Sequence, residues 1–400
     1  MIRKKSNSTI KSSTSLSAKD ILGNPNYLAL CYGGYRTNTR EVQPTIAQLK
    51  EDLRILSALN IKLIRTYNVH FDEAANLLKA IQEVKKEDSN FEMYVMLGAW
   101  IDCKNAWTDI TPDHNVESER NAKEIETAVA LANQYPEIVK IIAVGNEAMV
   151  KWAENYYVQP SVILKWVNHL QVLKKKNKLS KDLWITSSDD FASWGGGDKS
   201  YQTKDLEDLI RAVDYVSMHT YPYHNTHYNP NFWKVPNQEN SLTAIEKVDA
   251  GMARAQKVAE MQYKNVKDYV KSIRPNKPIH IGETGWASSS DGLYGSEGSK
   301  ASDEYKQALF YKSMRKWSAK EGISCFFFEA FDENWKDSAN QKGSENHFGL
   351  FTVDGKAKYA LWNQVDSGVF NSLKRDGKSI EKTFSGSNVK LKETVLMPPN

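Results

Sequence analysis

Short apolar runs alternate along the chain with longer segments in which apolar residues recur at helical spacing. In the segment that Pro44 opens, Ile46, Leu49, Leu53 and Leu56 share one face of an expected helix. The short runs are rich in β-branched residues and end at small or polar residues, which is typical of buried strands in a parallel sheet. Eight such strands are expected, at residues 27–33, 61–67, 92–97, 138–147, 183–187, 213–220, 279–283 and 323–329.

No hairpin turn joins any of these strands to the next, so the sheet is expected to be parallel. Eight strands that alternate with helices predict an α/β fold of a single domain, a closed (β/α)8 TIM barrel. A doubly wound open sheet is the alternative. The first strand, however, is not followed by the Gly-rich phosphate-binding sequence of such folds.

Three segments are expected along the chain. Residues 1–20 are rich in Ser, Lys and Thr and predict a disordered N-terminal tail. Residues 21–362 form the barrel. Residues 363–400 are polar and too short for an independent domain, so they are expected to form a C-terminal extension whose role the sequence does not indicate.

Charge and composition narrow the classes of partner. A net charge of +4 on 400 residues gives little reason to expect nucleic acid or an anionic membrane, and no apolar run is long enough to span a bilayer. Eleven Trp and nineteen Tyr are more informative, because aromatic faces stack on the C–H faces of sugar rings. Most of these rings are expected in the core, but Trp100, Trp107 and Trp335 each follow a strand and are candidates for sugar contacts.

Cysteine and histidine spacing gives no sign of a metal site. Cys31, Cys103 and Cys325 are an odd number at wide spacing, which matches neither a zinc pattern nor a disulfide framework, so buried free thiols are expected. The region after residue 213 holds three neighbouring histidines whose spacing fits no metal site on a regular element, namely His219, His224 and His227.

Two glutamates at strand ends are the candidates for chemistry. Glu147 closes the fourth strand and Glu283 closes the seventh, and each follows a nearby glycine that lets a substrate approach the backbone. Cleaving an acetal needs a proton for the leaving oxygen and a group that meets the cationic sugar carbon, which one protonated and one ionised carboxyl group supply. Asn146 can offer its amide to a sugar 2-hydroxyl, and Tyr221 can donate a hydrogen bond that keeps Glu283 ionised. The alternative is that each glutamate is a salt-bridged strand end.

The segments around these glutamates carry a family resemblance. Val144–Glu147 (VGNE) and Ile281–Trp286 (IGETGW) resemble the acid/base and nucleophile motifs of glycoside hydrolase family 17. Further matching segments follow in the family's order, at Leu30–Gly33, Ile64–Tyr67, Tyr221–Tyr223, Phe331–Lys336 and Glu345–Phe351. The chain departs from the plant members after the sixth strand, where it is longer, and at Ala287, which replaces a proline.

The resemblance implies a retaining, endo-acting hydrolase of β-1,3-glucosidic bonds in laminarin-like glucans, with Glu147 as the acid/base and Glu283 as the nucleophile. It implies no cofactor, no metal and a monomer. The residues expected to bind substrate are Tyr32, Arg65, Asn146, Tyr221, Trp286, Glu333, Lys336 and Glu345. Two alternatives remain open, a β-1,3-glucanosyltransferase that uses the same glutamates and a non-catalytic glucan-binding barrel.

An extracytoplasmic location, whether periplasmic, cell-surface or secreted, is expected for such an enzyme. Residues 1–5 are basic like the start of a signal peptide, but no apolar region follows them, so the export signal is expected to be absent from this chain. A cytoplasmic location is the alternative.

Overall fold

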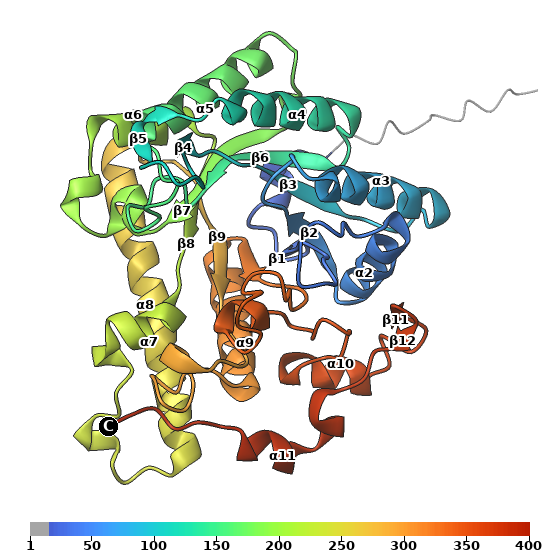
Figure 1. Ribbon diagram of the computed structural model, residues 1–400, viewed down its shortest axis with the longest axis vertical. Coiled ribbons are helices and arrows are strands. Elements are labelled where there is room, and N and C mark those ends of the chain that lie inside the picture. Colours follow the sequence, from blue (N-terminus) through green and yellow to red (C-terminus); the bar gives the residue numbers. More distant parts are fainter. Residues whose placement is uncertain (1–15) are drawn as a thin grey trace, which may run out of the picture.

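The computed structural model describes residues 16–400 and contains a closed barrel of eight parallel strands (Figure 1). Around the barrel the strands follow the order β1-β10-β9-β8-β7-β6-β3-β2, so the first strand pairs with both the second and the last. This arrangement confirms the expected (β/α)8 fold. The strands are β1 (Leu28–Cys31), β2 (Ile61–Arg65), β3 (Tyr94–Ala99), β6 (Val139–Asn146), β7 (Trp184–Asp190), β8 (Val216–His219), β9 (Ile279–Gly285) and β10 (Cys325–Phe328).

Amphipathic helices surround the strands. In α2 (Ile46–Ala58) the buried face includes Leu49, Leu53 and Leu56, as the helical spacing predicted, and Thr45 and Gln48 form a capping box at its start. α9 (Glu304–Glu321) is capped by Gly322, which adopts a left-handed conformation with φ of 66° that glycine accommodates without strain. The other long helices are α3 (Asp72–Glu87), α4 (Arg120–Gln134), α5 (Pro160–Lys175), α6 (Lys204–Ala212) and α8 (Ala244–Ile273).

The third strand continues past the glycine that was expected to stop it. β3 runs through Gly98 to Ala99, because the missing side chain lets β2 and the following loop come close. A Cβ atom at Gly98 would lie 2.5 Å from the Thr66 carbonyl oxygen and 2.6 Å from the Tyr67 backbone. Beyond β3 the chain forms a small antiparallel ribbon of β4 (Cys103–Lys104) and β5 (Asp113–Glu117).

The end of the expected N-terminal tail is ordered. Residues 1–15 lie outside the described part of the chain, but residues 18–20 belong to the short helix α1 (Ala18–Ile21). Ser17 and Asp20 cap this helix, and Ala18 and Ile21 are buried in the core. The polar composition of this segment gave no indication that Ala18 and Ile21 are buried.

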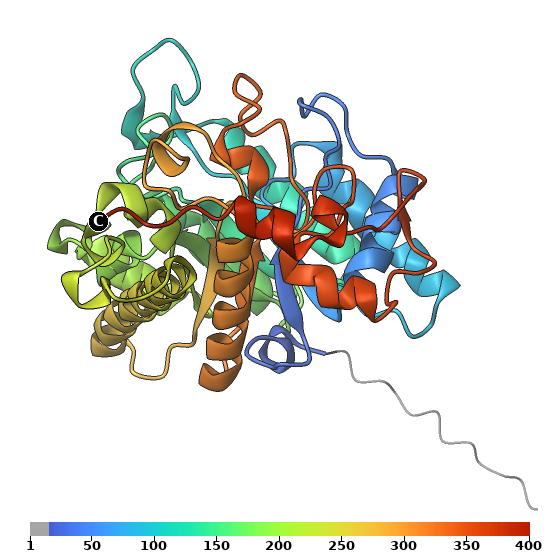
Figure 2. The ribbon, with the colours of Figure 1, turned by 90° about the horizontal axis from the view of Figure 1, so that it is seen from below.

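The C-terminal extension packs along the outside of the barrel (Figures 1 and 2). It contains α10 (Trp362–Asp366), β11 (Lys374–Arg375), β12 (Lys378–Ser379) and α11 (Asn388–Glu393). Arg375 is fully buried, pairs with Asp52 of α2 at 2.9 Å and lies 3.9 Å from the ring centroid of Phe331. Near the end of the chain the Pro399 carbonyl oxygen accepts a hydrogen bond from the backbone of Val235. The extension therefore straps together elements that are far apart in the sequence.

Cys31, Cys103 and Cys325 are buried free thiols, as expected. Within residues 16–400, no helix has both the length and the apolar character that crossing a membrane requires.

Candidate active site

The two predicted glutamates meet at the C-terminal end of the barrel. Glu283 lies within β9, and Glu147 directly follows β6. Gly145 and Glu147 both have positive φ angles, 81° and 48°, and this turn is fixed where the Glu147 backbone N–H donates to the Ser188 carbonyl oxygen at 2.9 Å. One carboxyl oxygen of Glu147 and one of Glu283 lie within 4.8 Å of each other. The two carboxyl groups therefore face one another across the barrel.

Glu283 is held by three hydrogen-bond donors. Its Oε2 accepts from Arg65 at 2.9 Å and from the Tyr67 hydroxyl at 2.7 Å, and its Oε1 accepts from the Tyr221 hydroxyl at 2.6 Å. Burial alone would favour the neutral acid, but the positive charge of Arg65 and the hydrogen bonds from the two hydroxyl groups outweigh it and lower the pKa of Glu283. The predicted hydrogen bond from Tyr221 is thus present, and Glu283 is an ionised carboxylate near neutral pH.

The pKa of Glu147 is shifted in the opposite direction. Burial is the main cause that raises its pKa to about 8, and the negative charge of Glu283 adds to the effect. Near neutral pH Glu147 therefore holds a proton while Glu283 does not. One protonated and one ionised carboxyl group at this separation can act as a general acid and a nucleophile on the same acetal.

His219 fixes which oxygen of Glu147 carries that proton. Its Nδ1 lies 2.9 Å from Glu147 Oε1, and its Nε2 lies 3.1 Å from Arg65 Nη1 and 2.8 Å from Ser188 Oγ. Since Arg65 can only donate, Nε2 must accept and Nδ1–H must donate to Oε1. Burial lowers the pKa of His219 to about 4, so the ring is neutral. The acidic proton of Glu147 is consequently left to Oε2.

The spacing of His219 in the sequence suggested at most a metal ligand and gave no sign of this contact with Glu147. Its position two residues before Tyr221, at the end of the sixth barrel strand, could have pointed to it. Glu147, His219 and Glu283 do offer ligand atoms within 4.8 Å of one another, which is close enough for a metal ion. The guanidinium group of Arg65, however, already contacts Glu283 and His219, so a cation placed among these atoms would meet a fixed positive charge. The donor set therefore suits proton transfer better than a metal.

Arg65 is buried beside Glu283. Only 1% of it is exposed, and it also donates to the Gly282 carbonyl oxygen at 2.7 Å and to the Asn146 side-chain oxygen. A sugar cannot reach so enclosed a side chain, so its predicted substrate contact is replaced by an ion pair with Glu283. Because Asn146 accepts through its oxygen, its NH2 group is left to donate toward the cavity, as predicted for a sugar 2-hydroxyl.

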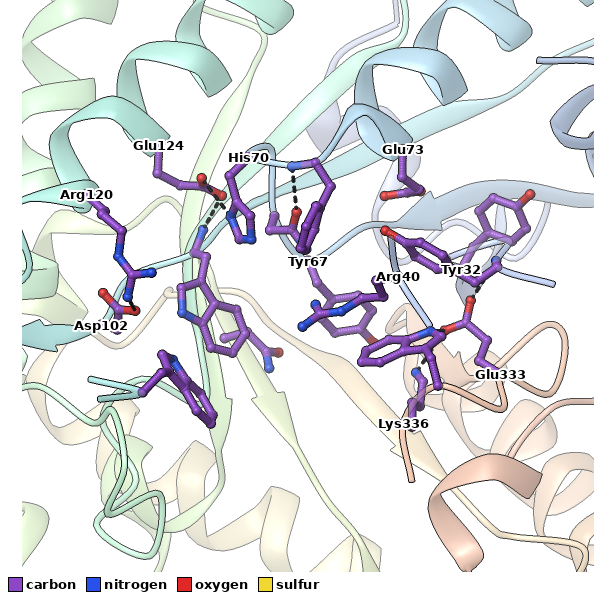
Figure 3. Close-up of a pocket in the computed structure, with 18 of the residues that line it drawn as sticks. Tyr32, Arg40, Tyr67, His70, Glu73, Asp102, Arg120, Glu124, Glu333 and Lys336 are labelled. Carbon is purple, nitrogen blue, oxygen red and sulfur yellow. Dashed lines mark hydrogen bonds and ion pairs between the residues drawn. The ribbon is translucent and has the colours of Figure 1, made fainter. Parts of the chain in front are cut away.

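A cavity of about 810 Å³ opens beside Glu283 (Figure 3). Asn146, Glu333 and Lys336 line it, in agreement with their predicted positions. Lys336 lies 3.0 Å from Glu329 and 3.2 Å from Glu333, and these charges raise its pKa despite its burial. Glu345 lies outside this lining, exposed in the 3-10 turn Ser344–His347.

Two predicted sugar contacts are wrong or reduced in this structure. Trp286 is completely buried, donates its indole N–H to the Ala301 carbonyl oxygen at 2.8 Å and packs against Trp233, so it cannot stack on a substrate. Tyr32 lines the cavity, but its hydroxyl group is turned toward Asp52, to which it donates at 2.9 Å. Both side chains follow strand ends, yet they fill the space between strand and helix.

Aromatic residues cover two regions of the cavity wall. Trp100, Trp107 and Trp335 all line the cavity, as expected from their place after strand ends. Trp107 is 56% exposed and stacks on Tyr156 with ring centroids 5.0 Å apart. In Figure 3 the labelled Asp102 and Arg120 lie at one end of the cavity, while Glu73 and Glu333 lie at the other. Such an open, aromatic-lined cavity suits an extended carbohydrate.

Comparisons with known proteins identify the family of this chain. The model of the BtgE/BtgC glycoside hydrolase domain matches residues 29–349. The crystal structure of an endo-laminarinase from Formosa Hel1_33_131 is 62% identical, with a TM-score of 0.95 over 96% of this chain and 98% of that one. The glycoside hydrolase family 17 β-1,3-glucanosyltransferase of Rhizomucor miehei is 17% identical, with a TM-score of 0.57 over 84% of this chain and 96% of that one, and shares the fold.

The match with a curated fungal relative covers most of this chain but less than half of that relative. The "Probable glucan endo-1,3-beta-glucosidase btgC" of Aspergillus flavus is 25% identical over 329 residues, which is 80% of this chain. The chain spans 40% of the length of that relative.

Proposed function

The chain belongs to the BtgE/BtgC glycoside hydrolase family, and from this premise we propose that it hydrolyses internal β-1,3-glucosidic bonds of laminarin-like glucans with retention of configuration. The observation that carries the proposal is the pair Glu147 and Glu283, with oxygens within 4.8 Å of each other and opposite protonation states. Retaining glycosidases hold their carboxyl groups about 5–5.5 Å apart, whereas inverting ones leave about 6.5–9.5 Å for a water molecule. The similarity to an endo-laminarinase at 62% identity supports both the linkage and the endo mode.

We also propose that this family lies within glycoside hydrolase family 17. The motifs around Glu147 and Glu283 support this assignment. So does the order of the other matching segments between residues 30 and 351.

In the first half-reaction Glu283 is the nucleophile. Its ionised carboxylate bonds to the anomeric carbon while the bond from that carbon to the glycosidic oxygen breaks. The proton on Glu147 Oε2 passes to the departing oxygen, which leaves as a hydroxyl group. Tyr67 and Tyr221 hold the carboxylate of Glu283 in place for the attack, and Asn146 donates to the sugar 2-hydroxyl.

In the second half-reaction Glu147, now ionised, is the base. It takes a proton from a water molecule whose oxygen bonds to the anomeric carbon, and the bond to Glu283 breaks. Glu147 regains its proton and Glu283 its charge, so the site returns to its starting state. Two inversions at one carbon give net retention.

Product analysis on laminarin tests the activity. We expect new reducing ends from chain interiors, with the β-anomer formed first in a ¹H NMR time course. An α-anomer formed first would contradict retention. Oligosaccharides longer than the starting compound would identify a glucanosyltransferase instead, and the absence of new reducing ends would identify a non-catalytic glucan-binding barrel.

We further propose an extracytoplasmic location, because a glucan polymer does not cross a cell membrane intact, and a monomeric state, because one chain supplies both glutamates. Fractionation of the producing cells and light scattering of the purified protein test these two points. Activity confined to the cytoplasm would refute the first, and a stable dimer would refute the second.

A further inference from the structure

One end of the cavity holds polar groups that the catalytic steps do not use. Glu73, in the first turn of α3, is only 3% exposed, and Tyr35, after β1, is 4% exposed. Both line the cavity. Within residues 16–400, Glu73 Oε1 and the Tyr35 hydroxyl have no hydrogen-bond partner. Leaving a buried polar group unpaired costs about 1–3 kcal/mol, so two such groups in one wall favour binding of a ligand that pairs with them.

An aromatic wall stands beside these groups. Arg40 lies 4.3 Å from the ring centroid of Trp335 and 4.9 Å from that of Phe71, and Tyr35 packs edge-on against Trp335. The guanidinium group of Arg40 donates no hydrogen bond to the rest of the described chain and also lines the cavity. Flat apolar surfaces beside unused donors and acceptors are what a pyranose ring with equatorial hydroxyl groups requires.

The protonation state of Glu73 fits an uncharged ligand. Burial raises the pKa of Glu73 well above its usual range, and the nearby Glu333 adds to the effect. A neutral carboxyl group donates one hydrogen bond and accepts others, as a sugar hydroxyl group does. A cationic ligand would instead meet the guanidinium group of Arg40.

A continuous series of contacts joins this end to the catalytic carboxylate. Tyr67 donates to Glu283 and packs edge-on against Phe328 with centroids 6.3 Å apart. Lys336 lies 4.3 Å from the ring centroid of Phe328 and 5.2 Å from that of Trp335. The polar groups thus lie beyond the sugar that Glu283 attacks, along the same cavity wall.

We propose that Tyr35, Arg40, Glu73 and Trp335 form a distal subsite that binds a glucosyl unit of the glucan chain away from the bond being cleaved. This inference rests on the proposed function. The residues come from the loop after β1, the start of α3 and the loop after β10. The subsite makes the enzyme favour long chains over short ones.

Kinetics on laminari-oligosaccharides of increasing length test the subsite. The ratio of kcat/KM for laminariheptaose to kcat/KM for laminaritriose is measured for the wild type and for Glu73→Leu, which removes donor and acceptor together. Loss of one hydrogen-bonding partner predicts a fall of about tenfold in this ratio. Glu73→Gln, which keeps a neutral donor and acceptor, should give a smaller fall than Glu73→Leu.

Glu83→Leu is the matched control, since Glu83 lies on the same helix but pairs with Lys50 on its outer side. Its ratio should equal that of the wild type. An unchanged ratio in Glu73→Leu would overturn the subsite. If both kcat/KM values fell equally, the role of Glu73 would be purely structural. If the wild type cleaves neither oligosaccharide nor laminarin, the proposed function itself fails, which is a separate outcome.

Discussion

Replacing Arg65 with methionine should move the pH range of activity upward. Arg65 is the buried cation beside Glu283, at 2.9 Å, and it helps to hold the pKa of that carboxyl group below its usual range. Methionine keeps much of the side-chain volume but removes the charge. The pKa of Glu283 then rises, so its ionised form, which is the nucleophile, is populated only at higher pH.

The size of the shift follows from the contacts. Removing one partner of a buried ion pair costs roughly 3–5 kcal/mol, which is the upper limit on the free energy that ionisation of Glu283 loses in the variant. Tyr67 and Tyr221 still donate to Glu283, so the loss stays below that limit. The acidic limb of kcat/KM, which follows the ionisation of Glu283, should therefore move to higher pH.

The assay is a pH profile of kcat/KM on a soluble laminari-oligosaccharide, with circular dichroism at each pH to confirm that the variant is folded. Arg65→Lys is the control, because it keeps the charge and should keep most of the acidic limb in place. An acidic limb that stays where it is in Arg65→Met, with activity reduced equally at every pH, would refute the electrostatic role of Arg65.

Three further predictions concern stability and substrate contact. Burial raises the pKa of Glu147 to about 8, above the value near 4.3 of an unfolded chain, so its stabilising effect is complete below that value and is lost as pH rises toward 8. Glu147→Gln stays neutral, and its melting temperature should exceed that of the wild type by more at pH 8 than at pH 5; an equal difference at both would refute the titration. Arg375→Met leaves Asp52 without one of its buried partners and should lower the free energy of unfolding by roughly 3–5 kcal/mol in urea titrations, whereas a loss under 1 kcal/mol would mean that the C-terminal extension is not a strap. Trp107→Ala removes an exposed ring, so KM on laminarin should rise severalfold while the melting temperature stays within about 1 °C, and an unchanged KM would exclude sugar contact.

The barrel and the glutamate pair were accessible from the sequence because both depend on local pattern. β-Branched runs alternate with helical periodicity, and parallel strands of a barrel end on one face. Glu147 directly follows one such strand and Glu283 lies near the end of another, so their meeting follows from the fold alone. The hydrogen bond from Tyr221 to Glu283 follows in the same way.

Other features depend on packing that no local pattern records. Trp286 follows the same strand as Glu283, but side chains of neighbouring residues point in different directions, and only the structure shows that this ring turns into the core. Asp52 and Arg375 form an ion pair although they are 323 residues apart in the sequence. Neither this separation nor the polar composition of the extension indicated that it packs as a strap. The role of His219 could not be predicted for another reason. It depends on the tautomer of the ring, which Arg65 fixes from another strand.

The central claim is that Glu147 and Glu283 act on opposite faces of the same sugar through a covalent intermediate. The most direct test is Glu147→Ala assayed with azide on an aryl β-laminaribioside whose leaving group needs no acid. Azide should restore turnover and give a β-configured glycosyl azide, because it attacks the Glu283-bound sugar from the face that Glu147 has vacated. An α-configured azide, or no rescue in a folded variant, would contradict the double displacement.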